Sequence, residues 1–492
     1  MQSILAALQT EFEKTGSTPE RVFKYQGVDK STYVGRWSSI TRRADAIVSG
    51  NVTLEVSNTD QSWNVILSSP QTHIIPGATA SAIQIGYTAI DFITLFTGKL
   101  ESADFRNVDS VSLSFKDKIA YFTEAQIGSS QTPADYCSAS GVLVTDFSGG
   151  TTRNWSAGRN PADMIWSILV TYGGLDSTES VANVDIDWTT FLAYKTLLNS
   201  IGIKIQGYFK GETITTVLQE IKDIAMTTIF SEADGKLYVR YWLGQDNTSV
   251  QSYTSAKWKE VPSVSIDRLN IKNSHVIYYG FTFTNSDTGT ATSGTSTTLV
   301  DTTKTWVANA YKNYIITITG GTGVGQSRLI GSNDATTITI NFAWTTALDA
   351  TSTYKIFDPS IGAFADSITK SDPTSIGYYG TLEKVWDSQI VWNYDSSSAG
   401  NMGDRQLLDT KDPVKYVTFE SFLLAYRQQL WDALKLTESF YSWTDQGFRI
   451  EELSFNSNEG MVEISGRATT LYPFLILDDP VNGKLDSIYV LA

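Results

Sequence analysis

The sequence predicts a mainly β protein of several domains, with an α+β region in the middle of the chain. Three observations support this fold class. The 492 residues are 41% hydrophobic and 12% aromatic, which is enough for several buried cores. Only 18% of them are charged, whereas Thr, Ser, Gly, Tyr and Trp are abundant, a balance that favours strands and turns. Several segments also alternate apolar and polar residues, as strands with one buried face do.

Composition excludes several classes of protein. The net charge of −15 argues against a surface that binds nucleic acid, because phosphate binding needs clustered Lys and Arg. Cys137 is the only cysteine, so neither an intrachain disulfide nor a thiolate metal cluster can form, and we interpret it as a buried or half-buried thiol. No window reaches about eighteen uninterrupted apolar residues, so we expect a soluble protein or part of a soluble particle.

Residues 1–20 are expected to form an amino-terminal helix or arm, because apolar residues recur on one helical face. Glu11 and Glu13 stand where a signal peptide needs basic residues, so no export signal is expected. Residues 21–150 are expected to form a first β-barrel-like domain. Within it, Thr97-Gly98 interrupts a strand where a bulge or bend would help a sheet to curl. Residues 129–150 are interpreted as a linker or extended loop.

The middle of the chain, residues 151–245, is predicted to be a compact α+β domain. Asn160, Pro161 and the glycines at 173 and 174 mark a helix over about 161–172. Asp187 is expected to cap a second helix, and apolar residues at three- and four-residue spacing predict a third over 213–226. A hairpin over 228–241 is expected to turn at Ala233-Asp-Gly235.

A second β-barrel-like domain is predicted from residues 246–284 and 358–477, followed by a tail over 478–492. Residues 285–357 interrupt it with a Thr- and Ser-rich composition and are expected to be an inserted small β domain. Later elements of the second domain are a flexible loop, a helix packed across the barrel and a hairpin, expected over 395–403, 419–437 and 448–465.

Catalysis has little support in the sequence. His73 and His275 are the only histidines, no Gly-x-Ser-x-Gly or His-Glu-x-x-His motif is present, and both are interpreted as surface or interface residues. A glycosidase needs only two carboxylates, but a pair such as Glu451 and Glu452 is the ordinary solvated face of a strand. We therefore expect no catalytic, cofactor-binding or metal-binding residues and no cofactor.

Two motifs suggest ligands but are better explained structurally. Asn183, Asp185 and Asp187 alternate as in a calcium loop, yet the required Gly and Glu at the sixth and twelfth positions are replaced by Trp188 and Tyr194. Turn and cap formation is the preferred interpretation. The four glycines at 320, 321, 323 and 325 lack the Lys of a phosphate-binding loop and predict a tight β-turn.

The aromatic residues of the insert have two interpretations. Aromatic side chains in small β domains are usually core, and this is the preferred interpretation. Stacking on sugar rings is the alternative. The residues concerned are Trp306, Tyr311, Tyr314, Trp344 and Tyr354.

Several segments, taken in order, resemble a known family. The stretch from Val22 to Ile127 is similar to the first barrel domain of tail hub, or baseplate hub, proteins of long-tailed bacteriophages. The segments that carry this resemblance are 37–40, 50–58, 95–102 and 109–117. The middle domain resembles the same proteins through an Asn-Pro-Ala-Asp helix, an Asn-x-Asp-x-Asp-Trp segment and an Asp-Gly-Lys-Leu hairpin. The insert resembles a β module found in phage tail and baseplate proteins, through 289–294, Trp306, 319–328 and 349–354.

The resemblance implies a structural virion protein at the distal end of the tail. It implies a homotrimer whose two barrels per subunit form a pseudo-sixfold ring between the tail tube and a threefold tip, around the channel for genome ejection. Implied partners are the tail tube or distal tail protein, the tape-measure protein and tip fibre or spike proteins. DNA would pass without specific binding, and the acidic balance suggests a negatively charged lumen.

Two other functions stay open. The first is a receptor- or carbohydrate-binding adhesion protein that contacts host-surface glycan through the insert. The second is a tail-associated wall-degrading enzyme, although no recognisable catalytic domain follows Leu471.

Overall fold

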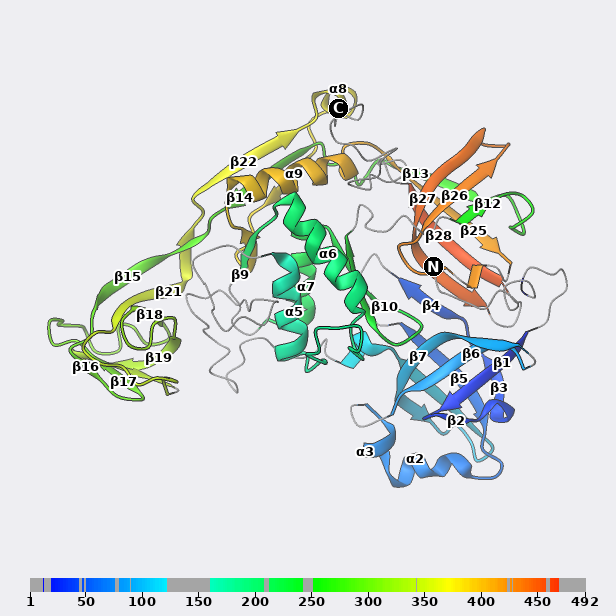
Figure 1. The fold of residues 1–492 in the computed structure, drawn as a ribbon, viewed down its shortest axis with the longest axis horizontal. Helices are drawn as coiled ribbons and strands as arrows, with labels where there is room; N and C mark the ends of the chain where they lie inside the picture. Colours follow the sequence, from blue (N-terminus) through cyan, green and yellow to red (C-terminus); the bar gives the residue numbers. More distant parts are fainter. Residues whose placement is uncertain are drawn as a thin grey trace.

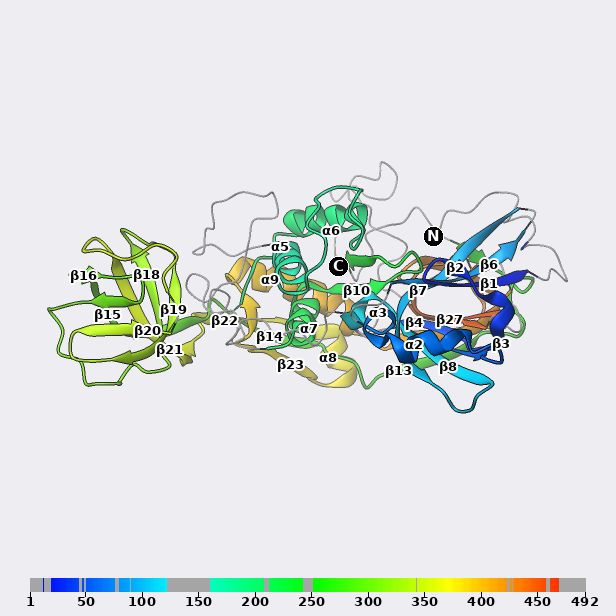
Figure 2. The ribbon, with the colours of Figure 1, turned by 90° about the horizontal axis from the view of Figure 1, so that it is seen from below.

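A computed structural model describes most of the chain and confirms the mainly β fold class with an α+β middle (Figure 1). Two β domains lie side by side, helices cover the centre of the molecule, and a small β domain lies at the far end (Figure 2). Within the residues that the structure describes, no helix has both the length and the apolar character that a membrane crossing needs. The described residues are 12, 19–43, 47, 50–75, 79–88, 90–121, 160–207, 212–241, 251–341, 343–422, 425–426, 428–456 and 461–468.

The first β domain is a curled antiparallel sheet in the order β4-β5-β8-β7-β6-β1-β2, with β3 beside β5. The predicted alternation is confirmed, since Val52, Leu54 and Val56 of β5 point into the core. In the described ranges, neither β1 nor β2 pairs with β3 or β4. Backbone hydrogen bonds therefore do not close the barrel at this place. The strands are β1 (Glu20–Tyr25), β2 (Val28–Asp29), β3 (Val34–Trp37), β4 (Ile40–Arg43), β5 (Asn51–Ser57), β6 (Ser81–Tyr87), β7 (Asp91–Asp104) and β8 (Ser110–Lys116), with short helices α2 (Val65–Ser68) and α3 (Pro70–His73).

Strand β7 bends where the sequence predicts a bend. It pairs with β6 as far as Gly98 and with β8 from Lys99 onward. The register shifts on both sides of this point, at Leu95 against β6 and at Glu101 against β8. A Cβ atom on Gly98 would lie 2.4 Å from the Lys116 carbonyl oxygen. Glycine therefore permits the close approach that lets one strand serve two parts of a curled sheet.

The three predicted helices of the middle domain are confirmed: α5 (Pro161–Ser167), which continues as a π-helical turn to Tyr172, α6 (Trp188–Ile201) and α7 (Ile214–Ala225). The Asn160 side chain accepts a hydrogen bond from the Ala162 amide, and Asp187 and Thr213 cap the other two helices. The predicted hairpin consists of β10 (Thr227–Ser231) and β11 (Leu237–Tyr241). These elements share one apolar core.

A five-stranded sheet adds later segments to this middle core. Its order is β22-β14-β24-β9, with β23 beside β14, and α9 packs on it. The expected limits of the second β domain stay a prediction, but these strands lie in one sheet with β9, and among the described residues none of them pairs with that domain's sheet. The elements are β9 (Ile205–Gly207), β14 (Ser274–Tyr279), β22 (Asp366–Ser371), α8 (Pro373–Tyr379), β23 (Glu383–Trp386), β24 (Val391–Asn393) and α9 (Ser396–Thr410).

The prediction of a flexible loop over 395–403 is wrong, because helix α9 begins there. Asp395 caps it by accepting a hydrogen bond from the Ser398 amide at 2.8 Å. A Cβ on Gly403 would lie 2.6 Å from Ile277 Cδ1. The small residues that resemble a loop in the sequence are small because the helix lies close against its sheet.

The insert is an antiparallel sheet with its own core, in the order β15-β21-β18-β19-β20-β17-β16. The long strands β15 and β21 connect it to the rest of the chain (Figure 1). Its strands are β15 (Thr282–Thr290), β16 (Ser293–Gly294), β17 (Thr298–Val300), β18 (Ile315–Gly320), β19 (Ser327–Asn333), β20 (Thr337–Ile340) and β21 (Thr353–Ala363).

The second β domain has its sheet in the order β13-β25-β28-β27, with β26 beside β27 and β12 beside β26. The hairpin predicted over 448–465 is confirmed by the pairing of β27 with β28. The helix predicted over 419–437 is wrong, because two strands and an irregular connection occupy that span. The strands are β12 (Gln251–Tyr253), β13 (Ser263–Asp267), β25 (Val414–Ser421), β26 (Ala433–Glu438), β27 (Trp443–Asn456) and β28 (Met461–Ala468).

Candidate assembly interface

The two β domains have the same strand order. In chain order, the six shared strands are β1, β4, β5, β6, β7 and β8 in the first domain and β12, β13, β25, β26, β27 and β28 in the second. In both sheets the order is second, third, sixth, fifth, fourth, first. One difference is that β1 runs antiparallel to its neighbour β6, whereas β12 runs parallel to β26. The chain therefore contains one sheet topology twice.

The bulge in the fifth strand aligns the two domains residue by residue. In β7 the register shifts at Glu101, and in β27 it shifts at Glu451. From this anchor, Lys99-Leu100-Glu101 matches Arg449-Ile450-Glu451, and a phenylalanine follows four residues after each Glu. The same ladders align residues 52–55 (Val-Thr-Leu-Glu) with 417–420 (Val-Thr-Phe-Glu). The resemblance implied two related barrels, but the residue-by-residue match is not visible in the sequence, because the matches are short and far apart and only the shared register connects them.

The two domains are joined edge to edge by β4 and β27. We call this pairing the joint. Residues 40–43 of β4 pair antiparallel with residues 452–455 of β27, and Phe455 lies opposite Ile40. The hydroxyls of Thr41 and Ser454 are 3.2 Å apart, and Arg43 lies 3.6 Å from the Glu452 carboxylate. Because of the joint, both domains belong to one continuous 14-stranded sheet.

A buried charge cluster connects the joint to the middle domain. Arg42 of β4 forms an ion pair with Glu232, which follows β10, and both side chains are buried. Glu232 also accepts a hydrogen bond from the Leu430 amide at 3.0 Å, while Arg240 donates to the Leu430 carbonyl at 3.2 Å. Burial raises the pKa of Glu232, and the neighbouring guanidinium groups oppose this shift. The cluster thus holds three separate parts of the chain together.

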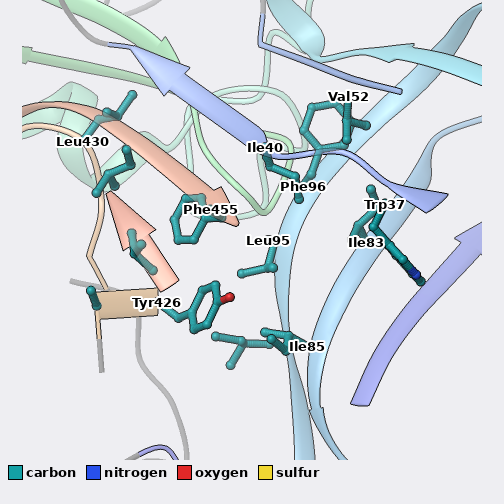
Figure 3. Close-up of a cluster of buried hydrophobic side chains, with 14 of the residues drawn as sticks. Trp37, Ile40, Val52, Ile83, Ile85, Leu95, Phe96, Tyr426, Leu430 and Phe455 are labelled. Carbon is teal, nitrogen blue, oxygen red and sulfur yellow. The ribbon is translucent and has the colours of Figure 1, made fainter. Parts of the chain in front are cut away.

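Apolar side chains from both β domains fill the space beside the charge cluster (Figure 3). Tyr426 stacks on Phe455 with ring centroids 5.4 Å apart, and both point toward Leu95 of the first domain. Tyr426 and Leu430, whose spacing suggested a helix, belong to the irregular connection and are buried at this place. The connection does not form the predicted helix because its side chains pack into a core that the two β domains share.

A polar cleft lies between the second β domain and the middle domain. It has a volume of about 500 Å³, and its lining includes Asp409, Glu451 and Arg467. Arg467 forms an ion pair with Asp409 at 3.0 Å, and burial raises the pKa of the Asp409 carboxyl. Across the parts of the chain that the structure describes, no group of three or more His, Cys, Asp or Glu side chains is arranged to hold a metal ion.

The two histidines lie in different places. His73 accepts or donates a hydrogen bond with the Tyr25 hydroxyl at 2.8 Å, at the edge of the first domain's core. The interpretation of His275 as a surface or interface residue is wrong, because it is fully buried in the middle domain. The Trp386 indole donates to its Nδ1 at 3.0 Å, and its Nε2 lies 2.9 Å from the Thr410 hydroxyl. Burial lowers its pKa to about 4, so it is a neutral core residue near pH 7.

The segment that resembles a calcium loop forms a turn and a helix cap, which is the interpretation preferred from the sequence. Asn183 is buried, and its amide group donates to the carbonyls of Asp176 and Thr178. Its oxygen accepts from the amides of Asp185 and Ile186. Asp185 forms an ion pair with Lys118, and Asp187 caps helix α6. These oxygens bind groups of the chain itself.

The glycine-rich loop is the predicted tight turn between β18 and β19. Gly321, Gly323 and Gly325 have φ values of 72°, 81° and 87°. A Cβ on Gly321 would lie 1.9 Å from the Thr351 carbonyl oxygen. Glycine is therefore required at these positions by the positive φ angles and the close backbone contact.

The five aromatic residues of the insert mostly form its core. Trp344 and Tyr354 are buried, and the other three pack partly buried against the same cluster. Two of them also form hydrogen bonds within the insert: the Tyr354 hydroxyl donates to Asp301 at 2.6 Å, and the Trp306 indole donates to Asp287 at 2.5 Å. Cys137, the residues before 19 other than Phe12, the 129–150 segment and the 478–492 tail lie outside the described residues.

Comparisons with known proteins concern the fold. No protein-family model and no curated protein matches the chain. A 43 kDa tail protein of prophage MuSo2 from Shewanella oneidensis aligns over 92% of this chain and 99% of its own, with 13% identity and a TM-score of 0.44. A tail protein from Neisseria meningitidis aligns over 92% and 98%, with 11% identity and a TM-score of 0.45. A prophage tail protein from Listeria monocytogenes aligns over 92% and 95%, with 10% identity and a TM-score of 0.42.

All three are tail proteins, two of them from prophages, and the sequence resemblance likewise names phage tail proteins. The chain is similar to them along nearly its whole length.

Proposed function

We propose that this chain is a structural hub protein at the distal end of a phage tail, or of a tail-derived particle, where it forms a homotrimer. The observation that supports this proposal best is the duplicated β domain, with its two copies joined edge to edge by β4 and β27. Three chains would supply six equivalent domains. Such a trimer joins the sixfold tail tube to the threefold tip, which are the neighbours that the sequence resemblance implies.

The division of the chain into repeated and single parts fits this role. The β-domain topology occurs twice per chain, so a trimer can present it six times to a sixfold tube. The middle domain and the insert occur once per chain, so the same trimer presents them three times to a threefold tip. A chain with one β domain would need six copies, and its other domains would then follow sixfold symmetry as well.

The proposed partners are the tail tube or distal tail protein, the tape-measure protein, and tip fibre or spike proteins. DNA would leave through the central channel without specific binding. The net charge of −15 supports a lumen that repels DNA. Particles in which acids that line the channel are replaced by Lys should eject their genome more slowly, and an unchanged rate of ejection would count against a repulsive lumen.

The experiment that tests the hub proposal is a mass measurement by light scattering with negative-stain electron microscopy of the same sample. We expect three times the mass of one chain, and a threefold ring with a central opening. The same imaging of purified tails should show this ring at the distal end. A chain that is monomeric in solution and absent from the distal end of tails would overturn the proposal.

The proposal assigns the chain no enzymatic role. In the polar cleft, the Asp409 carboxylate is already paired with Arg467, as expected of a structural ion pair. Purified chain should leave peptidoglycan and glycan substrates intact. Hydrolysis that disappears in Asp409→Asn or Glu451→Gln, while the fold of the variant is retained, would favour the wall-degrading alternative.

The arrangement of the insert favours a second candidate function, which is adhesion. The insert lies at the far end of the molecule from the two β domains, on the extended strands β15 and β21 (Figure 2). Because Thr290 and Thr353 are paired across these strands, residues 291–352 can be replaced by Asn-Gly, which favours a tight hairpin. If the insert binds a host-surface glycan, particles with this deletion should assemble normally and lose attachment. Normal attachment would exclude this role.

A further inference from the structure

Two strand edges are left open by the joint. Strand β13 ends the 14-stranded sheet, so among the described residues its outer edge pairs with no strand. Beyond Leu100, β8 is the only strand of the described chain that pairs with β7, and Ser102 and Asp104 are exposed there. Ile266 of β13 is 64% exposed, which is unusual for an aliphatic residue in a strand. Open edges of this kind are ready to pair with another chain, and proteins usually protect them.

The topology relates these open edges to the edges that form the joint. The joint pairs the second strand of the first domain, β4, with the fifth strand of the second domain, β27. The open edges belong to the second strand of the second domain, β13, and to the fifth strand of the first domain, β7. The open edge of β13 is therefore equivalent to the β4 edge of the joint, and the open edge of β7 is equivalent to the β27 edge. One chain cannot bring them together through its own joint, whereas a second copy can.

The ladders also fix the register of such a contact. Thr41 pairs with Asn51, and Ser265 pairs with Tyr416. Asn51 and Tyr416 are equivalent through their partners Lys116 and Arg467, so Ser265 corresponds to Thr41.

The same alignment places residues 102–105 on 452–455, since both follow the bulged glutamate. In the joint, Arg42 lies opposite Leu453 and Ile40 opposite Phe455. The copied contact therefore sets Ile266 opposite Ala103, and Val264 opposite Phe105.

We propose that β13 of one copy pairs antiparallel with residues 102–105 of β7 in a second copy, and so continues the sheet from subunit to subunit. The proposal rests on the homotrimer proposed above and names the edges that build it. The contact is heterologous, and such a contact closes into a ring when its rotation allows. Backbone hydrogen bonds supply the pairing, as in other strand additions.

The joint within one chain and the proposed contact between two chains differ in the side chain at one register position. Within a chain, Arg42 lies in the register position of Ile266 and forms an ion pair with Glu232. Between chains, the aliphatic Ile266 would be buried there against Ala103 and Phe105. This difference gives the contact between subunits an apolar centre. No charged side chain therefore has to be desolvated at the position of Ile266.

Cysteine cross-linking tests the pairing directly. In a chain carrying Cys137→Ser, the double variant A103C/I266C should form disulfides between copies under mild oxidation, because opposite residues in an antiparallel ladder lie about 4.5–5.5 Å apart. Non-reducing gels should show covalent dimers and trimers. Single variants A103C and I266C should give dimers only when they are mixed. The register control A103C/S265C, which points the second thiol to the other face, should cross-link much less.

A charge variant gives an independent readout. Ile266→Lys should weaken the trimer at least tenfold in dissociation constant, while the melting temperature of the monomer stays unchanged because the residue is exposed. Leu67→Lys is the matched control, since Leu67 is an aliphatic residue of similar exposure, 62%, and lies in helix α2, outside both proposed edges. It should leave the trimer intact.

The outcomes separate this inference from the hub proposal. A trimer that forms without cross-linking in A103C/I266C overturns the strand pairing and leaves the hub proposal standing. Cross-linking that continues beyond trimers supports the pairing and contradicts the closed threefold ring. A chain that neither assembles nor cross-links, both in solution and in purified tails, overturns both.

Discussion

Arg42 and Glu232 form a buried ion pair between strand β4 of the first β domain and the hairpin of the middle domain. The pair lies directly beside the joint, and the Arg42 guanidinium also lies over the Phe455 ring of the second β domain, 4.7 Å from its centroid. Three domains therefore meet at one arginine. Removal of one member of a buried pair leaves the other charge without compensation, which is more costly than the loss of an exposed pair.

Arg42→Met should destabilise the chain by about 3 kcal/mol, because Glu232 would then be buried with less positive charge around it. The measurement is the free energy of unfolding in denaturant. Lys259→Met is the control, since it removes the exposed pair of Lys259 with Glu420 and should cost at most about 1 kcal/mol. Equal effects of the two substitutions would show that the buried pair has no special role at the joint.

The stability of the middle domain should depend on pH through His275. Its pKa is about 4 in the folded chain, against about 6.5 when unfolded, so below pH 6.5 the unfolded state binds more protons. Stability should therefore fall as the pH decreases from about 6.5 toward 4, by on the order of 2–3 kcal/mol from this residue. His275→Gln should lack this contribution. Melting temperatures of both proteins across this range should converge at low pH, and a constant difference would contradict the assignment.

Gly98→Ala should destabilise the first β domain by about 2–4 kcal/mol. The added Cβ would lie 2.4 Å from the Lys116 carbonyl oxygen and 2.6 Å from the Phe96 ring, at the bend of β7. Gly377→Ala in helix α8 is the matched control, because a Cβ there meets no atom within 4 Å. It should be neutral or stabilise by up to about 1 kcal/mol. Thermal unfolding of the two variants measures both effects, and equal stabilities would contradict a steric role of Gly98.

Asn183→Ala should cost about 2–4 kcal/mol, because the buried Asn183 side chain is the hydrogen-bond partner of two carbonyls and two amides. Calcium should neither stabilise the native chain nor rescue the variant, since the nearby carboxylates already accept hydrogen bonds or pair with Lys118. The test is the melting temperature with calcium and with a chelator. A clear rise with calcium in the native chain would restore the metal interpretation.

The sequence predicted best those elements whose signals are local. The caps at Asn160 and Asp187, the helix predicted over 213–226, the hairpin turn at residues 233–235 and the alternation in β5 each depend on residues a few positions apart. Neighbouring residues meet in almost any fold, so patterns among them survive unchanged in the folded chain. The same holds for the bend at Gly98 and for the turn glycines of the insert.

The sequence failed where a distant contact decided the outcome. Gly403 is small because Ile277 lies beside helix α9, and the connection around Tyr426 is irregular because its side chains fill a core between two domains. His275 is buried by Trp386 and Thr410, which lie more than one hundred residues away. No local pattern records such contacts.

The repeat shows both sides of this limit. Each strand of the two β domains carries its own alternation, and that alternation is readable from the sequence alone. Their equivalence becomes visible only through the shared bulges at Glu101 and Glu451. Likewise, only the tertiary structure decided which edges meet in the joint and which stay open. Strand pairing joins residues that are hundreds of positions apart, and the free energy that selects one pairing comes from the common core. The sequence by itself determined the strands, and the packing determined their partners.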